Sequence, residues 1–367
     1  MKIYVLYLIM STINLSGSYQ ILQSKNKSKF EVIELFAGCG GMALGFENAG
    51  LNTKLLVDIN KNSCETLQKN RPNWNVINQD ITQLEFTEYA NQIDVVAGGF
   101  PCQAFSHAGE RKGFLDTRGT LFFDFARCIK QVQPKIVIAE NVKGLITHKK
   151  GETLQIILNT LDELGYYSSY KLLNAQYFDV PQKRERVIII AVRKDLDIKI
   201  VFPQEKNYII TLKEALKNCP KSKGVIYNQR KKNIMQLVPE GGNWRSLPEQ
   251  IQKEYMKNSY YQGGGRTGFA KRLAYDEPCL TLTCSPSQTQ TERCHPIETR
   301  PLTIREYARV QTFPDDWEFA GSLTSQYQQI GNAVPVNLAY HLGCSLIAML
   351  EGKTGLCSEK VTQLSLF

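Results

Sequence analysis

The 367-residue chain lacks several features that would place it in a membrane or in an oxidising compartment. Its ten cysteines follow no regular spacing, which argues against a disulfide framework and for reduced thiols. The apolar run Ile3–Met10 is too short to span a bilayer, and Ser11–Gln20 contains no small-residue cleavage site. We therefore expect a cytoplasmic protein without a membrane partner.

Acidic residues are absent before Glu31, and the chain has no internal repeat. We predict that residues 1–29 form a disordered or loosely packed N-terminal extension. A zinc site is also excluded, because the residues that come nearest to one have the wrong spacing: Cys279, Cys284, Cys294 and His295. The last two of these are adjacent in the chain and cannot easily share one ion, so no metal is expected.

Basic residues outnumber acidic ones. The chain has 44 Lys and Arg against 35 Asp and Glu, a formal net charge of +9, which favours a polyanionic partner. With 43% hydrophobic and 22% charged residues, the composition is that of an ordinary globular protein. The length fits one large or two modest domains.

Strand and helix patterns alternate from Phe30 to about Val192. Expected strands are Glu31–Phe36, Lys54–Val57, Val95–Ala97, Ile136–Ala139 and Val187–Val192. Expected helices are one that ends at Asn48, one at Thr120–Val132 and one at Glu152–Leu164. This alternation predicts an α/β fold with a doubly wound, mostly parallel sheet.

The amino-acid composition changes after residue 198, where Pro, Gly, Gln, Thr and Tyr become frequent and the hydrophobic periodicity is poor. We predict a second, smaller, loop-rich domain at residues 199–300. Helical patterns return at Thr303–Thr312 and Val336–Leu350. We assign residues 301–330 to a hinge that supports the second domain, and residues 331–367 to a return to the first domain.

A cysteine on a stiff loop is the most informative feature of the chain. Cys102 follows Pro101 just after the apolar run Val95–Ala97, and Pro101 fixes its own φ and removes a backbone donor. A thiol at the carboxyl end of a strand is a candidate nucleophile, although free cysteines are usually small buried hydrophobes. Three charged side chains abut neighbouring expected strands: Glu140, Arg184 and Arg186. This combination of groups suits attack on an electron-poor ring.

A glycine-rich turn joins the first expected strand to its helix. The glycines of Phe36–Gly41 allow close approach of a ligand, and the helix N-terminus offers free N–H groups to an anion. Asp58 follows the second strand, where an acid binds ribose hydroxyls. The pattern Gly38-x-Gly40-x-x-Ala43 also fits a loose dinucleotide fingerprint, so an NAD enzyme and a turn without ligand both remain alternatives here.

Six short motifs occur in order along the chain. They are Glu34–Gly41 (ELFAGCGG), Gly99–Gln103 (GFPCQ), Glu140–Val142 (ENV), Gln182–Arg186 (QKRER), Arg305–Pro314 (REYARVQTFP) and Gly331–Pro335 (GNAVP). Together they resemble the motifs of the C5-cytosine DNA methyltransferase family, of the bacterial restriction-modification type. The resemblance covers about Phe30–Arg193 and Arg300–Ala339. It implies a catalytic domain at residues 30–198 and a target-recognition domain at residues 199–300.

The resemblance implies that the cofactor is S-adenosylmethionine, converted to S-adenosylhomocysteine. Phe36 would lie against the adenine, Asp58 would hold the ribose and Asp80 would face the adenine amino group. The full set of cofactor-binding residues that it implies is Phe36, Gly38, Gly40, Gly41, Asp58, Ile59, Asp80, Ile81, Pro101, Leu121, Asn332 and Ala333.

The resemblance also implies roles in catalysis. The thiolate of Cys102 would add to C6 of cytosine, so that C5 can attack the sulfonium methyl group. Glu140 would hydrogen-bond the ring at N3. Arg186 would lie against the base with Arg184 as its support, and both would supply the cationic surroundings that a thiolate needs.

C5 and C6 of cytosine are buried in a duplex, so the target base must be flipped out of double-stranded DNA. Ser106, Lys112 and Arg118 follow the thiol and are expected to contact phosphates. In the second domain, Thr281 and Leu282 match a Thr-Leu element of the family's recognition domain, so the resemblance implies that they contact DNA. We also expect DNA contacts from Gln288, Gln290 and Arg293, because Gln suits adenine edges and Arg suits guanine edges. The basic run Arg230–Lys232 is expected to contact phosphates without regard to sequence.

Three alternatives were weighed against this reading. A tRNA cytosine methyltransferase would carry a Cys-Phe-Thr element in its second domain, which the chain lacks. A non-catalytic DNA-binding relative would not need intact Cys102, Glu140 and Arg186, and an NAD enzyme would leave the Pro-Cys and Glu-Asn-Val elements unexplained. We predict a monomeric DNA (cytosine-5)-methyltransferase that protects host DNA from a restriction endonuclease in the same cell.

Overall fold

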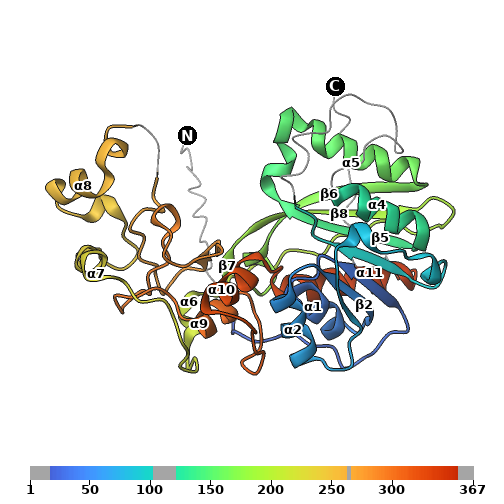
Figure 1. Cartoon of the computed structure of the whole chain (residues 1–367), viewed down its shortest axis with the longest axis horizontal. Coiled ribbons are helices and arrows are strands. Elements are labelled where there is room, and N and C mark those ends of the chain that lie inside the picture. Colours follow the sequence, from blue (N-terminus) through green and yellow to red (C-terminus); the bar gives the residue numbers. More distant parts are fainter. Residues whose placement is uncertain (1–16, 102–120, 263–265, 354–367) are drawn as a thin grey trace, which may run out of the picture.

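The computed structural model describes residues 17–101, 121–262 and 266–353. In this part of the chain the main feature is a seven-stranded sheet with the order β3-β2-β1-β4-β5-β8-β6 (Figure 1). Its strands are β1 (Glu31–Leu35), β2 (Asn52–Asp58), β3 (Val76–Asn78), β4 (Val95–Gly98), β5 (Ile136–Val142), β6 (Tyr166–Asn174) and β8 (Glu185–Arg193). The first five strands in the order are parallel, whereas β8 is antiparallel to both of its neighbours.

Helices cover both faces of the sheet, which confirms the predicted doubly wound, mostly parallel α/β fold (Figure 1). They are α1 (Gly41–Ala49), α2 (Lys61–Asn70), α4 (Leu121–Val132), α5 (Glu152–Glu163) and α11 (Val336–Leu350). Residues of α4 and α5 contribute to one hydrophobic core, and residues of α1 and α11 contribute to a second. Most of the expected elements agree with the observed ones within two residues at each end, which is the usual uncertainty of a boundary.

One boundary differs for a physical reason. The apolar pattern of β5 ends at Ala139, but the strand continues to Val142 because its backbone still pairs with β8, up to Val142 opposite Arg186. The polar residues Glu140 and Asn141 are therefore inside a strand rather than after it. Their positions are fixed by the sheet.

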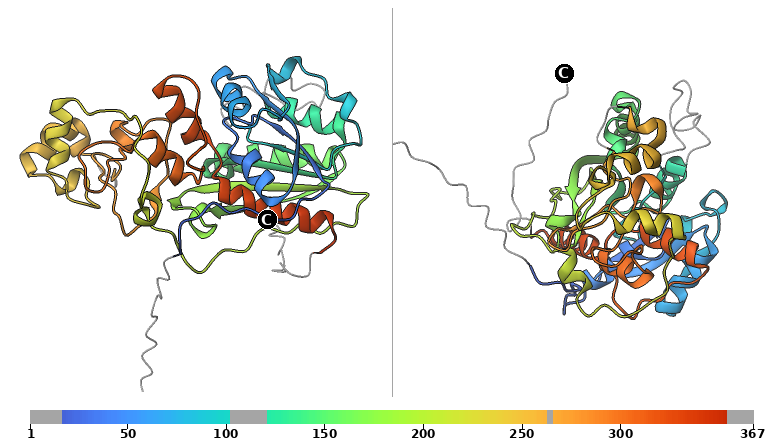
Figure 2. Two further views of the ribbon diagram at one scale, coloured as in Figure 1. Left: turned by 90° about the horizontal axis from the view of Figure 1, so that it is seen from below. Right: turned by 90° about the vertical axis from the view of Figure 1, so that its left-hand side faces the viewer.

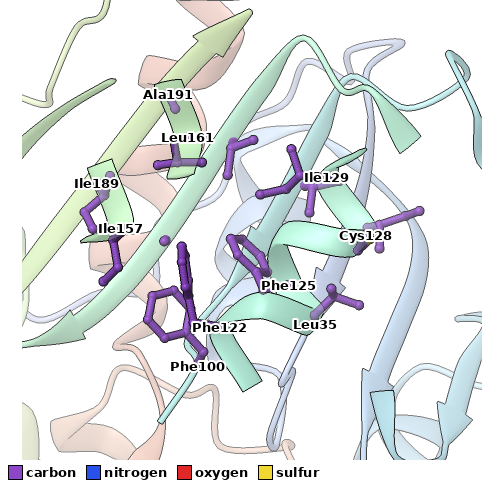
Figure 3. Close-up of a cluster of buried hydrophobic side chains, with 14 of the residues drawn as sticks. Leu35, Phe100, Phe122, Phe125, Cys128, Ile129, Ile157, Leu161, Ile189 and Ala191 are labelled. Carbon is purple, nitrogen blue, oxygen red and sulfur yellow. The ribbon is translucent and has the colours of Figure 1, made fainter. Parts of the chain in front are cut away.

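Aromatic rings fill the core beside the loop that follows β4 (Figure 3). The ring of Phe100 lies 5.1 Å from that of Phe122 and 5.7 Å from that of Phe125, centroid to centroid. Phe122 and Phe125 belong to α4, so this helix anchors the residue that comes directly before Pro101. The ring cluster thus holds the start of the cysteine loop against the sheet.

The last helix packs closely on the first. A Cβ atom at Gly45 would lie 2.4 Å from Cβ of Ala339, and one at Gly41 would lie 2.2 Å from the carbonyl oxygen of Val334. Only glycine allows this approach, because any side chain would collide with the backbone of the C-terminal segment. The close packing brings Asn332 and Ala333 to the loop after β1.

A helical stretch of 28 residues, Leu323–Leu350, is apolar enough to span a membrane by length and composition, with a mean hydropathy of 1.5. The stretch consists of two helices, α10 (Leu323–Asn332) and α11, which have 10 and 15 residues and are separated by residues 333–335. In its most apolar window of 18 residues, 61% of the residues are buried within the protein, so the stretch has the character of a core element.

The chain between the sheet and α10 forms a second lobe (Figures 1 and 2). It contains α6 (Leu212–Leu216), α7 (Gln229–Gln236), α8 (Glu249–Met256), β9 (Cys279–Leu280) and α9 (Ile304–Val310). Part of this lobe has a small hydrophobic cluster of its own, which includes Tyr227, Met235 and Trp244. It joins the sheet lobe through β7 (Gln182–Lys183), which pairs in parallel with β9. The helices α7 and α8 were not predicted, because they are short and mainly polar.

Residues 17–29 differ from the prediction of a disordered or loosely packed extension. Leu22 N donates to Asn337 Oδ1 at 3.0 Å, and Asn337 Nδ2 donates to the carbonyl oxygen of Gln20 at 2.8 Å. Further on, Ser24 N and Ser28 N donate to carbonyl oxygens of residues 48 and 50, each at 2.7 Å. This segment forms no helix or strand, but its backbone is bonded to α11 and to the end of α1.

We predict that Phe125→Ala lowers the free energy of unfolding by about 3–5 kcal/mol, because it empties the ring cluster around Phe100. Urea unfolding followed by circular dichroism measures the change. The control is Ile226→Ala, whose side chain is 87% exposed, and which should change stability by less than about 0.5 kcal/mol. Equal effects of the two substitutions would contradict this account of the core.

Candidate active site

A cavity of about 710 Å³ opens at the carboxyl ends of the parallel strands. The strand order reverses there, since β1 leads outward to β2 and β3 whereas β4 leads outward to β5. At such a switch point the loops that follow neighbouring strands diverge, and the crevice between them binds ligands. Residues that follow β1 and β4, together with the ends of β2 and β5, line this cavity.

The loop after β1 has an unusual backbone. Phe36 and Gly38 both have positive φ, 60° and 54°, and such conformations gather at ligand sites. Asp58, at the end of β2, accepts from the backbone N–H of Gly38 and of Asn60, each at 2.8 Å. Burial raises the pKa of Asp58, against the effect of these two hydrogen bonds. The carboxylate therefore fixes the loop, and each of its oxygens keeps a lone pair for a ligand hydroxyl.

Seven of the expected cofactor-binding residues line the cavity: Phe36, Gly38, Gly41, Asp58, Pro101, Asn332 and Ala333. Five others do not line it: Gly40, Ile59, Asp80, Ile81 and Leu121. Phe36, Gly38 and Pro101 lie in the loops after β1 and β4, and Asp58 ends β2. Gly41 begins α1, Asn332 ends α10, and Ala333 lies between α10 and its successor α11.

The five residues outside the lining have other placements. Gly40 caps α1 with a φ of 87°, and a Cβ there would lie 2.6 Å from Leu67. Asp80 caps a short 3-10 helix, Ile81 is buried in the core and Leu121 packs against that core. Ile59 is 70% exposed. Turn geometry and core packing account for Gly40, Ile81 and Leu121. The assignment of all five residues to cofactor binding stays a prediction.

Glu34 lines the cavity and was missed by the sequence analysis. It lies in β1 with 3% of its surface exposed, and among the described residues its Oε2 has no hydrogen-bond partner. Burial, and then the charge of Asp58, raise the pKa of Glu34 well above its ordinary value. An acid flanked by apolar residues inside a buried strand is the sequence signal that could have identified it, since buried acids are rare unless they have a role.

Glu140 and Arg186 form an ion pair at the cavity wall. Arg186 Nε lies 2.7 Å from Glu140 Oε1, and the two side chains are only 12% and 11% exposed. The other oxygen, Oε2, faces the loop after β4, where a Cβ at Gly99 would lie 3.2 Å from it. The pair therefore stands directly beside the start of the cysteine loop.

Asn141 joins this loop to β5. Its Nδ2 donates to the carbonyl oxygen of Phe100 at 2.9 Å, and its Oδ1 accepts from Val142 N at 2.9 Å. Cys102, the predicted nucleophile, lies outside the described residues, as do the predicted phosphate contacts Ser106, Lys112 and Arg118. Asn141 and the rings around Phe100 thus fix the chain up to Pro101, which lines the cavity.

Arg184 has a different position from the one predicted. Its guanidinium is buried and donates to carbonyl oxygens of Leu282 at 3.3 Å and of Gly331, Asn332 and Ala333 at 3.1, 3.5 and 3.0 Å. Burial, and then the charge of Arg186, lower the pKa of Arg184 to about 9. These bonds make Arg184 a positioning residue that ties the second lobe to the cavity wall, rather than a support for Arg186 alone.

The expected DNA-reading residues fall into two groups. Gln288 and Gln290 are exposed. By contrast, Leu282 is buried, the Thr281 hydroxyl donates to the carbonyl oxygen of Lys183 at 2.6 Å, and Arg293 donates to the carbonyl oxygens of Thr281 and Glu292. The side-chain polar groups of Thr281 and Arg293 are therefore bonded inside the protein. The assignment of Thr281, Leu282 and Arg293 to DNA binding stays a prediction.

The sheet order and the switch-point cavity are those of an α/β protein that binds a ligand at the carboxyl ends of its strands, which fits a methyltransferase that uses S-adenosylmethionine. The family model of C-5 cytosine-specific DNA methylases matches residues 30–348, and the chain belongs to this family. It is a DNA (cytosine-5)-methyltransferase with S-adenosylmethionine as its cofactor.

Similar bacterial proteins are also named as methyltransferases. The chain is 57% identical to the Type II methyltransferase M.Eco47II of Escherichia coli over 332 residues, which cover 88% of this chain and 80% of that protein. It is 52% identical to the Type II methyltransferase M.Sau96I of Staphylococcus aureus, over 89% of this chain and 77% of that protein. A solved E. coli prophage protein described as a DNA modification methyltransferase superimposes with a TM-score of 0.64 at 24% identity, over 88% of this chain and all of that one. At that identity the likeness supports the fold.

We predict that Glu34 makes the stability of the cofactor-free protein depend on pH. Its raised pKa means that the folded state binds this proton more tightly than the unfolded state does, so the stabilisation is complete below about pH 4.5 and is lost as the pH rises. Glu34→Gln removes the titration. The free energy of unfolding of the variant minus that of the wild type should therefore increase with pH from about 4.5 upwards, by at most about 1.4 kcal/mol per pH unit.

Urea unfolding at pH values from 4.5 to 8 measures this difference. The control is Glu163→Gln, at an exposed position on α5, for which the difference should stay nearly constant. A constant difference for Glu34→Gln as well would show that this carboxyl does not titrate as its burial requires.

Proposed function

We propose that the chain methylates C5 of a cytosine that is flipped out of a short, specific sequence in double-stranded DNA, with Cys102 as the nucleophile. The observation that carries the proposal is that one cavity is shared by the turn of Phe36 and Gly38, by Pro101 and by the Glu140–Arg186 pair. A methyl donor and a base that occupied this cavity would lie side by side, which is the arrangement that direct transfer between them needs.

The cavity fits S-adenosylmethionine. Asp58 would accept from the ribose hydroxyls, and Phe36 would lie against the adenine ring. The orphaned carboxyl oxygen of Glu34 faces this cavity and suits the cationic amino group of the methionine part. When bound, the cofactor would supply an electrophilic methyl group on a sulfonium, whose neutral thioether, S-adenosylhomocysteine, is the good leaving group.

The protein's own groups would prepare cytosine for this attack. The Cys102 thiolate would form a bond to C6, and the electron pair of the C5–C6 double bond would then be available at C5 as a nucleophile. Glu140 hydrogen-bonds the ring at N3 and takes up the charge that develops there. A base then removes the proton from C5, and the thiolate leaves from C6 as the double bond re-forms.

Arg186 would contact the same base. It is held by Glu140 at 2.7 Å, so its guanidinium is oriented before the base arrives. The reading of the DNA sequence falls to the second lobe, where Gln288 and Gln290 remain the exposed candidates to contact base edges.

The biological setting follows from this activity. We propose that the protein acts as a monomer in the cytoplasm and protects host DNA from a restriction endonuclease of the same cell. Its similarity to proteins named as Type II methyltransferases supports this role.

Transfer of labelled methyl groups to DNA and to tRNA tests the proposed substrate. We expect label in duplex DNA only, and bisulfite sequencing of DNA from a methylation-free host that expresses the protein should show one methylated sequence context. Label in tRNA instead of DNA would contradict the proposal.

We predict that Cys102→Ala abolishes methyl transfer and leaves cofactor binding unchanged, because the nucleophile is lost while the turn after β1 is intact. Turnover is measured with labelled cofactor, and cofactor affinity by calorimetry. Cys128→Ala, in the buried core, is the control for the loss of a thiol. Turnover by purified Cys102→Ala would remove this residue from the nucleophile role.

We predict that Glu140→Gln slows methyl transfer by about 10²-fold or more, which is the scale expected when a proton donor is lost. An amide can still accept from Arg186 but cannot supply a proton to N3. The rate is measured in a single turnover, and DNA affinity in a separate binding assay. A rate near that of the wild type, with DNA binding intact, would exclude the role assigned to Glu140.

A further inference from the structure

An exposed loop of the second lobe carries the two candidate base-reading side chains. Residues 287–291 include Gln288 and Gln290, and the loop lies between Thr283 and Glu292. The backbone just before it abuts the cavity wall, since a Cβ at Gly331 would lie 2.3 Å from the carbonyl oxygen of Thr283. DNA with its target base in the cavity would therefore pass close to this loop.

A buried charge lies directly beneath the loop. The side chain of Glu292 is fully buried, and Tyr227 donates its hydroxyl to Glu292 Oε1 at 2.6 Å. Lys231, on α7, forms an ion pair with the same carboxylate. A buried carboxylate is costly unless it is paired and hydrogen-bonded, so the ammonium of Lys231 is needed at this place.

Lys231 also reaches the other end of the loop. Its Nζ donates to the carbonyl oxygen of Ser287 at 2.9 Å and lies 5.2 Å from the centre of the Tyr227 ring. One ammonium group thus joins the residue before Gln288 to the residue that closes the loop. With its side chain only 19% exposed, Lys231 is oriented toward the protein and not toward solvent.

A second contact fixes the same loop from another side. Glu292 N donates to the carbonyl oxygen of Gly268 at 3.0 Å, and a Cβ at Gly268 would lie 2.2 Å from the carbonyl oxygen of Gln290. The backbone of the loop is therefore packed on Gly268 and bonded to Lys231. Its exposed side chains are presented from a fixed base.

We propose that Lys231 is a positioning residue for sequence reading: its bonds to Ser287 and Glu292 hold the loop of Gln288 and Gln290 in the shape that recognises DNA bases. This inference rests on the proposed function, in which the second lobe reads the sequence. It replaces the expectation that the whole basic run Arg230–Lys232 contacts phosphate. Only its exposed members, Arg230 and Lys232, keep that role.

The test compares Lys231→Met with Lys232→Met. The two lysines are neighbours on α7, and both substitutions remove one positive charge and keep a long side chain. Each protein methylates an unmethylated, amplified bacterial genome, and bisulfite sequencing gives the ratio of methylation at the preferred sequence to that at sites with one changed base. The salt dependence of DNA binding is measured in parallel.

For Lys231→Met we expect this discrimination ratio to fall by about ten-fold, which is within the range that one altered base contact produces. For Lys232→Met we expect an unchanged ratio and a salt dependence that is weaker by about one phosphate contact. An unchanged ratio for Lys231→Met, with or without a weaker salt dependence, would overturn the proposal.

The double variant Lys231→Met/Glu292→Gln covers the case in which Lys231→Met does not fold, because it removes the uncompensated buried charge while Tyr227 can still donate to the amide oxygen. It should also lose discrimination, since the bond to Ser287 is gone. Full discrimination in the folded double variant would overturn the proposal. If the wild-type protein itself showed no preferred sequence, the proposed function would fail, and this result is distinct from any difference between the variants.

Discussion

Two buried polar side chains, Gln182 on β7 and Arg184 just after it, bond the sheet lobe to the second lobe and to the C-terminal segment. On β7, Gln182 Nε2 donates to Gln311 Oε1 at 2.8 Å while its Oε1 accepts from Leu282 N at 3.0 Å. The next residue but one, Arg184, donates to carbonyl oxygens of Leu282 and of the segment that ends in Ala333. Buried polar groups need hydrogen-bond partners. Those of Gln182 and Arg184 find theirs only when β7, the second lobe and the C-terminal segment are all in place.

The catalytic geometry depends on this junction. Arg186 follows Arg184 by two residues and meets Glu140 across the antiparallel pair of β5 and β8, so the same short stretch supports both the junction and the cavity wall. Asn141 connects that wall to the loop that leads into Cys102. A shift of the second lobe relative to the sheet would therefore disturb the segment around Ala333 that lines the cofactor side of the cavity. In the proposed function, the reading of the DNA sequence and the chemistry would share this one support.

Much of this fold could be predicted from the sequence, because alternation of apolar strands and amphipathic helices is a local signal. The turn after β1 and the positions of Glu140 and Arg186 could be predicted because motifs mark them. The role of Arg184 and the burial of Arg293 could not be predicted from the sequence. Both side chains are held by backbone carbonyl groups, which no residue type marks, and those that Arg184 contacts belong to distant segments of the chain. The inward orientation of Lys231 could not be predicted either. Its neighbours in the sequence are exposed, and it is oriented by an ion pair with Glu292, which lies far along the chain. A charged residue's role in a loop-rich region is set by tertiary contacts that leave no pattern in the chain.

The most direct test of the central claim is an experimental structure of the protein bound to S-adenosylhomocysteine and to a duplex with 5-fluorocytosine at the target position. Fluorine cannot leave C5 as a proton does, so the adduct should persist. The account predicts a bond from Cys102 Sγ to C6 of a flipped base, Glu140 beside N3, and the cofactor product against Phe36 and Asp58. A base that remains stacked in the duplex, or one that is bound by a different residue while the cavity holds the product, would contradict it.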